Sequence, residues 1–353
     1  MTEIARFETL VLGGGIIGAA ALFFLARAGN ECGLVERGRV GQGCTSHSGA
    51  VVRAFHLTPA LSDAALLGRN HYTQFRRHVG VDCPFTQTGF LYFPRPDQID
   101  AADHELRRMR GSCELAWLRP SEVSARFPEI RTETDAVYEP AAGYMQPREV
   151  VRGYIDAAVD AGARLYEGTA VEKLIRMNGR CVGVHTSAGA LLADRVVVAL
   201  GPETPSFLDR EHVSHGLWAQ KIQVDVRRGS GASTGHPAWI DDSLDLNGRP
   251  DGDRNFLVGF PTHDRNFSQG PTACSHAHSQ VIEEMAKRRF DWMSRTTFAG
   301  SRVSFDCYSS DGTGLVGYVD EPRGVLVASG FSGGGFKLAP AVGERVARLV
   351  AEG

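Results

Sequence analysis

Three glycines near the start of the chain have the spacing of a dinucleotide-binding turn. Gly13, Gly15 and Gly18 fit the pattern G-x-G-x-x-G within GGGIIG. The first glycine permits the tight bend, the second lets the backbone approach a pyrophosphate, and the third allows close helix–strand packing. The helix that starts at Ile16 and Ile17 then presents free N–H groups and its positive dipole end to the phosphates. The pattern therefore predicts a bound dinucleotide cofactor, which would carry out redox chemistry.

An acidic residue downstream supports this interpretation. Glu36 ends the apolar segment ECGLVE, and a carboxylate there can accept hydrogen bonds from a ribose 2′-OH and repel a 2′-phosphate. An NAD domain normally continues into further β-α-β units. Here the chain enters the glycine- and serine-rich segment RGRVGQGCTSHSGAVVRAFH instead. That segment suits a long cofactor tail surrounded by loops, so FAD is favoured over NAD.

The elements that must position these residues are those of an α/β protein. Phe7–Leu12 is predicted as a short buried strand and Ile16–Ala28 as an apolar helix. A second helix is expected at about Pro147–Ala161, and the apolar run Arg195–Leu200 is typical of a strand buried on both faces. Residues 220–263 alternate as half-exposed antiparallel strands do.

The predicted fold class is therefore α/β (α+β), with a Rossmann-type FAD-binding domain interleaved with an antiparallel-sheet substrate domain. The 353 residues exceed the size at which single cores stop growing. Residues 1–85, 145–205 and 300–353 are assigned to the FAD-binding domain. Residues 86–144 and 206–299 are assigned to the substrate domain.

Composition excludes several other classes of protein. A hydrophobic content of 42% and a net charge of −3 describe an ordinary globular chain with no sign of a nucleic-acid partner. The longest apolar run, IIGAAALFFLA, is too short to span a bilayer. The seven cysteines are scattered, which favours reduced thiols. No metal site is predicted, because CSHAH (residues 274–278) has no second ligand cluster. A cytoplasmic protein is expected.

Five segments together resemble the D-amino-acid-oxidase superfamily of FAD amine oxidoreductases, and within it the sarcosine oxidase and glycine oxidase branch. They are LVLGGGIIGAAALFFLARAG, CTSHSGAVVRAF, AAGYMQPREVVRGYIDAAVDAGA, VVVALGPET and GVLVASGFSGGGFKLAPAVGE. The first and fourth occur in many flavoproteins, whereas the second and fifth are more specific. The resemblance covers nearly the whole chain and implies bound FAD.

The resemblance also implies the cofactor contacts. The serine-rich loop would pass the isoalloxazine ring, and the glycine-rich turn near the end of the chain would bring backbone close to it. The helix after that turn would aim its N-terminus at the pyrimidine end, where reduced flavin gains negative charge. The implied contacts are Gly13, Gly15, Ile16, Ile17, Gly18, Glu36, Arg37, Thr45, Ser46, His47, Ser48, Val171, Gly201, Gly330, Gly333, Gly334, Gly335, Phe336 and Lys337.

In the sarcosine oxidase branch, a lysine and an arginine at the positions of Lys337 and Arg53 hold the substrate carboxylate. Lys337 is one of only four lysines in the chain and directly follows the turn GFSGGGF. An ammonium and a guanidinium that converge on one site capture a carboxylate. The alternative is an exposed lysine at a helix start, where a cation is electrostatically disfavoured.

Two features depart from the family pattern. Sarcosine oxidases position an oxygen-activating lysine after a segment like NFLVGFPTHD, but no lysine occurs between Lys221 and Lys287. His263 or Arg265 lies near the expected place and supplies positive charge, so His263 is a candidate catalytic residue. The covalent flavin cysteine of the family aligns with Ser304 rather than Cys307, so the FAD is predicted to be non-covalent.

The predicted reaction is oxidation of the C–N bond of an amino acid or N-substituted amino acid. Hydride transfer to flavin N5 gives an imine, water hydrolyses it, and O2 reoxidises the flavin to release H2O2. One alternative is an amino- or hydroxy-acid dehydrogenase that passes electrons to a quinone or carrier protein. Another is a non-catalytic flavoprotein subunit that stabilises an assembly with a partner.

Overall fold

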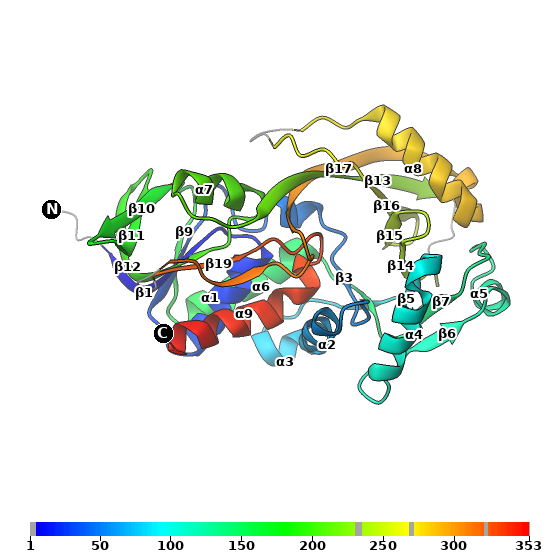
Figure 1. The fold of residues 1–353 in the computed structure, drawn as a ribbon, viewed down its shortest axis with the longest axis horizontal. Helices are drawn as coiled ribbons and strands as arrows, with labels where there is room; N and C mark the ends of the chain where they lie inside the picture. Colours follow the sequence, from blue (N-terminus) through cyan, green and yellow to red (C-terminus); the bar gives the residue numbers. More distant parts are fainter. Residues whose placement is uncertain (1–4, 230–234, 268–271, 321–323, 353) are drawn as a thin grey trace.

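The computed structural model describes residues 5–229, 235–267, 272–320 and 324–352 (Figure 1). A first sheet carries the dinucleotide-binding turn, and β1 lies between β12 and β2 in parallel register. Strand β19 extends the parallel set beside β12, whereas β10, β11 and β12 form an antiparallel meander. The described strands of this sheet are β1 (Arg6–Leu12), β2 (Cys32–Val35), β9 (Arg164–Tyr166), β10 (Val171–Met177), β11 (Arg180–Thr186), β12 (Gly189–Val198), β18 (Leu315–Tyr318) and β19 (Val325–Ser329).

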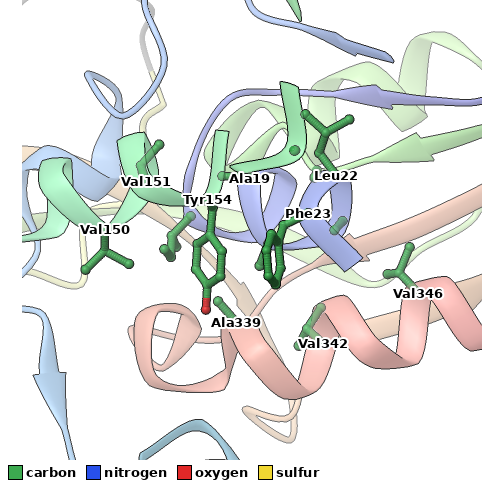
Figure 2. Close-up of a cluster of buried hydrophobic side chains, with 14 of the residues drawn as sticks. Ala19, Leu22, Phe23, Val150, Val151, Tyr154, Ala339, Val342 and Val346 are labelled. Atoms are coloured by element: carbon green, nitrogen blue, oxygen red, sulfur yellow. The ribbon is translucent and has the colours of Figure 1, made fainter. Parts of the chain in front are cut away.

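Three helices cover one face of the first sheet: α1 (Ile16–Arg27), α6 (Pro147–Asp160) and α9 (Gly335–Glu352). Figure 2 shows their apolar side chains meeting, with Phe23 and Tyr154 between the helices. A Cβ at Gly343 would lie 2.9 Å from the carbonyl oxygen of Ala20. Glycine at this position therefore lets α9 approach α1 closely. Burial of each large apolar side chain contributes about 1.5–3 kcal/mol relative to exposure.

A second sheet contains the remaining long strands, and all its pairings are antiparallel except β14 with β5. Strands β13 and β17 form a long pair that reaches from the first sheet to the second (Figure 1). The second sheet runs in the order β17 (Thr296–Ser309), β13 (Leu217–Gly229), β16 (Asn255–Pro261), β15 (Leu246–Asp251), β14 (Ala238–Asp241), β5 (Phe90–Phe93), β7 (Ala136–Glu139) and β6 (Ala116–Leu118). The predicted mixed α/β fold class is thus confirmed.

A short third sheet, the remaining α-helices and four 3-10 turns complete the part of the fold that the structure describes. A short sheet pairs β3 (Val51–Val52), β8 (Gly143–Tyr144) and β4 (Thr86–Gln87). The other α-helices are α2 (Pro59–Thr73), α3 (Phe75–Val79), α4 (Ile99–Arg108), α5 (Pro120–Arg126), α7 (Thr204–Arg210) and α8 (His276–Arg289). Single 3-10 turns occupy Cys44–His47, Pro96–Gln98, Gly201–Glu203 and Asp291–Arg295.

The predicted local elements agree with the structure to within a few residues at β1, α1 and α6. Strand β17 pairs with β13 in the second sheet, although residues 300–353 were assigned to the FAD-binding domain. The predicted division into two domains itself stays a prediction. In the part of the chain that the structure describes, every helix is too short or too polar to cross a bilayer.

Candidate active site

A cavity of about 500 Å³ lies at the carboxyl ends of the parallel strands β1, β2, β12 and β19. This edge of an open α/β sheet is where ligands bind, and the volume is typical of a small-molecule site. Most of the predicted cofactor residues line it: Gly13, Gly15, Ile16, Ile17, Glu36, Arg37, Thr45, Ser48, Val171, Gly201, Gly330, Gly333, Gly335 and Phe336.

The first glycine turn fits its predicted geometry. Gly13 has a φ of 104°, and a Cβ there would lie 2.4 Å from the carbonyl oxygen of Ala199. Gly18 lies behind the cavity wall, where a Cβ would meet the Gly13 carbonyl oxygen at 1.9 Å. The backbone N–H of Ile16 donates to Thr45 Oγ1 at 3.1 Å. The serine-rich loop is therefore tied to the start of α1.

The carboxylate of Glu36 is fixed at the cavity wall. Its two oxygens accept from the backbone N–H groups of Gly14 and Gly38, each at 2.8 Å. Each oxygen retains a lone pair for a further donor such as a ribose hydroxyl. Nearby, Arg37 forms an ion pair with Glu203 at 2.5 Å, and both side chains line the cavity.

The late glycine turn places the start of α9 beside the cavity. Gly330 and Gly333 have φ values of 89° and 80°, which favour glycine. Helix α9 begins at Gly335, so Lys337 lies in its first turn. From α2, Tyr72 donates to the Phe336 carbonyl oxygen at 2.7 Å. A Cβ at Gly68 would lie 1.9 Å from the Lys337 carbonyl oxygen, so α2 fixes this turn by direct backbone contact.

Lys337 is buried, with 8% of its surface exposed, and is therefore not the exposed lysine of the alternative interpretation. Burial, reinforced by the charge of Arg53, lowers the pKa of Lys337 to about 7, and Asp306 opposes this shift. Within the described residues its ammonium has no ion pair within 4.0 Å. A buried cation without a partner is costly unless an anion binds there.

Arg53 is the second buried cation, 7% exposed, and its Nη1 has no hydrogen-bond partner among the described residues. Its guanidinium lies over the Phe90 ring at 4.7 Å. Burial lowers the pKa of Arg53 to about 10, and Glu139 opposes the shift. Burial and the charges of Arg53 and Lys337 hold the pKa of His56 well below its usual range. Arg53, His56 and Lys337 are therefore within electrostatic range of one another, although none of the three lines the cavity.

Asp306 is a site residue that sequence reasoning missed. It lines the cavity from β17, and its carboxylate faces the glycine-rich turn, with Oδ2 4.0 Å from the Cβ position of Gly333. Burial raises the pKa of Asp306 to about 6, while a hydrogen bond with Cys44 and the charge of Lys337 oppose the shift. The only available signal was an isolated acid in the strand SRVSFDCYSS. Cys307 also lines the cavity, and burial raises the pKa of its thiol to about 11.

Several predicted residues lie elsewhere. Ser46 donates to the Gln42 and Gly43 carbonyl oxygens, and neither Ser46 nor His47 lines the cavity. His263 is exposed after β16, with a φ of 55°, and does not line the cavity. The roles proposed for these residues, and cofactor contacts at Gly18, Gly334 and Lys337, stay predictions. In residues 5–229, 235–267, 272–320 and 324–352, no cluster of His, Cys, Asp or Glu could hold a metal ion.

Comparison with known families decides the class of protein. The DAO family of FAD-dependent oxidoreductases matches residues 8–349. The chain belongs to this family. This FAD-dependent oxidoreductase is 26% identical to glycine oxidase of Geobacillus kaustophilus, over 98% of the chain and 93% of that relative. It is also 26% identical to monomeric sarcosine oxidase of Streptomyces avermitilis, over 98% of the chain and 94% of that relative. The resemblance drawn from the sequence is confirmed.

Other relatives extend the comparison. The oxidoreductase is 27% identical to 4-methylaminobutanoate oxidase (formaldehyde-forming) of Paenarthrobacter nicotinovorans, but spans only 44% of that protein's length. Among solved structures, L-proline dehydrogenase from P. horikoshii has a TM-score of 0.89 at 21% identity, covering 99% of this chain and 94% of the other. At that identity the likeness concerns the fold.

The residues of the cavity fit FAD. Glycine backbone forms its wall at Gly13 and Gly15, where the pyrophosphate would lie at the start of α1. Glu36 has acceptor capacity for the ribose, and the glycine-rich turn at residues 330–335 would pass the ring.

Proposed function

We propose that this FAD-dependent oxidoreductase oxidises the C–N bond of an amino acid or N-substituted amino acid. The proposal rests on one observation: Arg53 and Lys337 are both buried, lie within electrostatic range of each other, and have no acidic partner in ion-pair contact among the described residues. When bound, FAD would supply the hydride acceptor, and O2 would be the final acceptor of the electrons, giving H2O2. The imine product is hydrolysed by water.

The role of the two cations is to bind and orient. The guanidinium fork of Arg53 matches a carboxylate in two hydrogen bonds, and Lys337 adds a point charge. Both groups lie in a region from which water is largely excluded, so their attraction for an anion is stronger than at the surface. Holding the substrate in one pose lowers the entropic part of the barrier. A bound carboxylate also raises the pKa of Lys337 and keeps it charged.

A dehydrogenase that passes electrons to a quinone or carrier protein is the second candidate. It is favoured by the lack of any lysine between Lys221 and Lys287 and by the exposed position of His263. A relative of this chain is sarcosine oxidase subunit beta of Rhodobacter capsulatus, 22% identical over 99% of the chain, which supports a search for a partner subunit.

The test is an anaerobic screen of the purified holoenzyme against amino, N-methylamino and hydroxy acids. Loss of flavin absorbance is the signal that a compound has been oxidised. With a substrate in hand, Arg53→Ala should raise KM about 100-fold through loss of a charge-assisted bidentate contact, while flavin occupancy stays unchanged. Equal turnover of the decarboxylated amine by the wild type would contradict the carboxylate assignment. Admitting air then separates the candidates: rapid reoxidation with peroxide supports the oxidase, and slow reoxidation supports the dehydrogenase.

A further inference from the structure

Glu139 is a fully buried carboxylate at the end of β7, outside the cavity. Both of its oxygens accept from the backbone N–H of Ala54 at 2.9 Å, and Oε2 also accepts from Phe55 N–H at 3.0 Å. Arg69 Nη1 from α2 donates to Oε1 at 2.8 Å. A strand of the second sheet thus holds the chain at the two residues directly after Arg53.

These bonds satisfy groups that would otherwise be costly to bury. An isolated carboxylate in the interior is strongly disfavoured, but one with an ion pair and several N–H donors is not. The N–H groups of Ala54 and Phe55 likewise need acceptors, because both residues are fully buried. The network therefore specifies one conformation for the segment that follows β3.

The register of the second sheet also places Glu139 beside the residue that contacts the Arg53 guanidinium. Glu139 is the direct cross-strand partner of Phe90 in the β5–β7 pair. Directly opposed residues point to the same face of a sheet, and the Arg53 guanidinium lies over the Phe90 ring. The backbone after Arg53 and its guanidinium are thus supported by two neighbouring residues of one sheet.

Glu139 makes no ion pair with Arg53 itself within the described part of the chain. Its hydrogen bonds go to Arg69 and to backbone, yet it is the foremost of the charges that favour the protonated form of Arg53. A carboxylate in direct contact would compete with the substrate for the guanidinium. Because Glu139 is not in direct contact with Arg53, it favours the charged form of the guanidinium and leaves the guanidinium N–H groups available to the substrate carboxylate.

We propose that Glu139 is a positioning residue that fixes Arg53, in place and in charge, for the carboxylate of the substrate. This inference rests on the proposed function. A merely structural role of Glu139 would affect the stability of the fold. The positioning role also affects the affinity of the site for a carboxylate and the dependence of that affinity on pH.

The charges around Arg53 set the direction of the pH effect. Glu139, Tyr92 and Asp242 raise its pKa, whereas burial lowers it, and the charge of Arg53 in turn lowers the pKa of Lys337 and of His56. Glu139→Gln removes the foremost of the favourable charges, so the guanidinium loses its proton at lower pH. Carboxylate affinity should therefore fall in two steps as the pH rises, first near the Lys337 pKa of about 7 and then, as an alkaline limb, near the Arg53 pKa of about 10. Loss of the Glu139 charge should move only the alkaline limb to lower pH.

The experiment uses the holoenzyme with acetate as the probe. Acetate binding is followed by the flavin absorbance from about pH 6 to about pH 11, so that the Lys337 step and the Arg53 limb are both covered. Glu139→Gln should weaken acetate binding about tenfold at pH 8, with flavin occupancy unchanged, and shift the alkaline limb to lower pH. The matched control is Glu105→Gln. Glu105 is also buried and paired with an arginine, Arg108, but on α4. That control should change acetate affinity less than about twofold.

If Glu139→Gln does not fold, Glu139→Asp is measured in its place. It keeps the charge but draws the carboxylate back by one methylene, so affinity should fall while the alkaline limb stays where it is in the wild type. Wild-type affinity in Glu139→Gln, or in Glu139→Asp where that variant is used, would overturn the inference, as would an equal loss in Glu105→Gln. Arg53→Ala separates the two proposals: unchanged acetate binding there refutes the proposed function, whereas a loss confined to Arg53→Ala refutes only the role of Glu139.

Discussion

Lys337→Met offers a sharp test of the site, because the structure predicts that this variant is more stable than the wild type. Burial and Arg53 lower the pKa of Lys337 from 10.5 to about 7. Between these values the unfolded chain binds more protons than the folded chain, so stability rises with pH. The loss in free energy of unfolding caused by the buried Lys337 is therefore greatest at low pH and approaches zero near pH 10.5.

The magnitude follows from the two pKa values. At 1.36 kcal/mol per pH unit, the shift destabilises the fold by about 4 kcal/mol at pH 7 and about 2 kcal/mol at pH 9. Methionine keeps a similar apolar stem, and a volume-conserving exchange costs less than about 1.5 kcal/mol. With an exchange cost of about 1 kcal/mol, Lys337→Met should therefore gain about 3 kcal/mol at pH 7 and only about 1 kcal/mol at pH 9.

The assay is urea-induced unfolding in excess FAD at pH 7 and pH 9, with acetate affinity measured on the same samples. The control is Lys173→Met, which removes an exposed lysine of β10. We expect Lys337→Met to gain stability and lose acetate binding, and Lys173→Met to do neither. A Lys337→Met protein no more stable than the wild type at pH 7, or a gain that does not shrink at pH 9, would refute the description of Lys337 as a desolvated, unpaired cation.

Two other perturbations probe the same region. Gly68→Ala places a Cβ 1.9 Å from the Lys337 carbonyl oxygen, so it should cost about 1–3 kcal/mol of stability and weaken acetate binding. Gly317→Ala, with no atom within 4 Å of its Cβ position, should have little effect in the same urea-unfolding and acetate-titration experiments. Asp306 has a pKa of about 6, so wild-type acetate affinity should rise as the pH falls through 6 and this carboxylate loses its charge. In Asp306→Asn that step should be absent, and a step of wild-type size would exclude Asp306 as its source.

Local patterns were enough to predict the part of the cavity wall formed by Gly13 and Glu36. The turn at Gly13, the helix after it and the acid at Glu36 are neighbours along the chain, and each is required by the backbone geometry of a single β-α-β unit. The turn between β10 and β11 could likewise be predicted, because the pair Asn178–Gly179 favours positive φ in a two-residue turn, and the structure gives φ values of 52° and 80° there.

The surroundings of the two buried cations were only partly predictable. Resemblance pointed to Arg53 and Lys337, but their burial and their proximity arise from packing between α2, α9 and the second sheet. Position along the chain also suggested a cation at His263, which the structure leaves exposed after β16.

The sequence by itself determined which residues fold as local units and that a dinucleotide cradle opens the chain, because those signals depend on short-range periodicity and turn geometry. Only the tertiary structure decided that Asp306 and Glu139 belong to the surroundings of the two cations. Asp306 reaches the turn from a strand whose partner, β13, is distant in sequence, and Glu139 reaches Ala54 across 85 positions. Such contacts are set by strand register and burial, which no short stretch of sequence encodes.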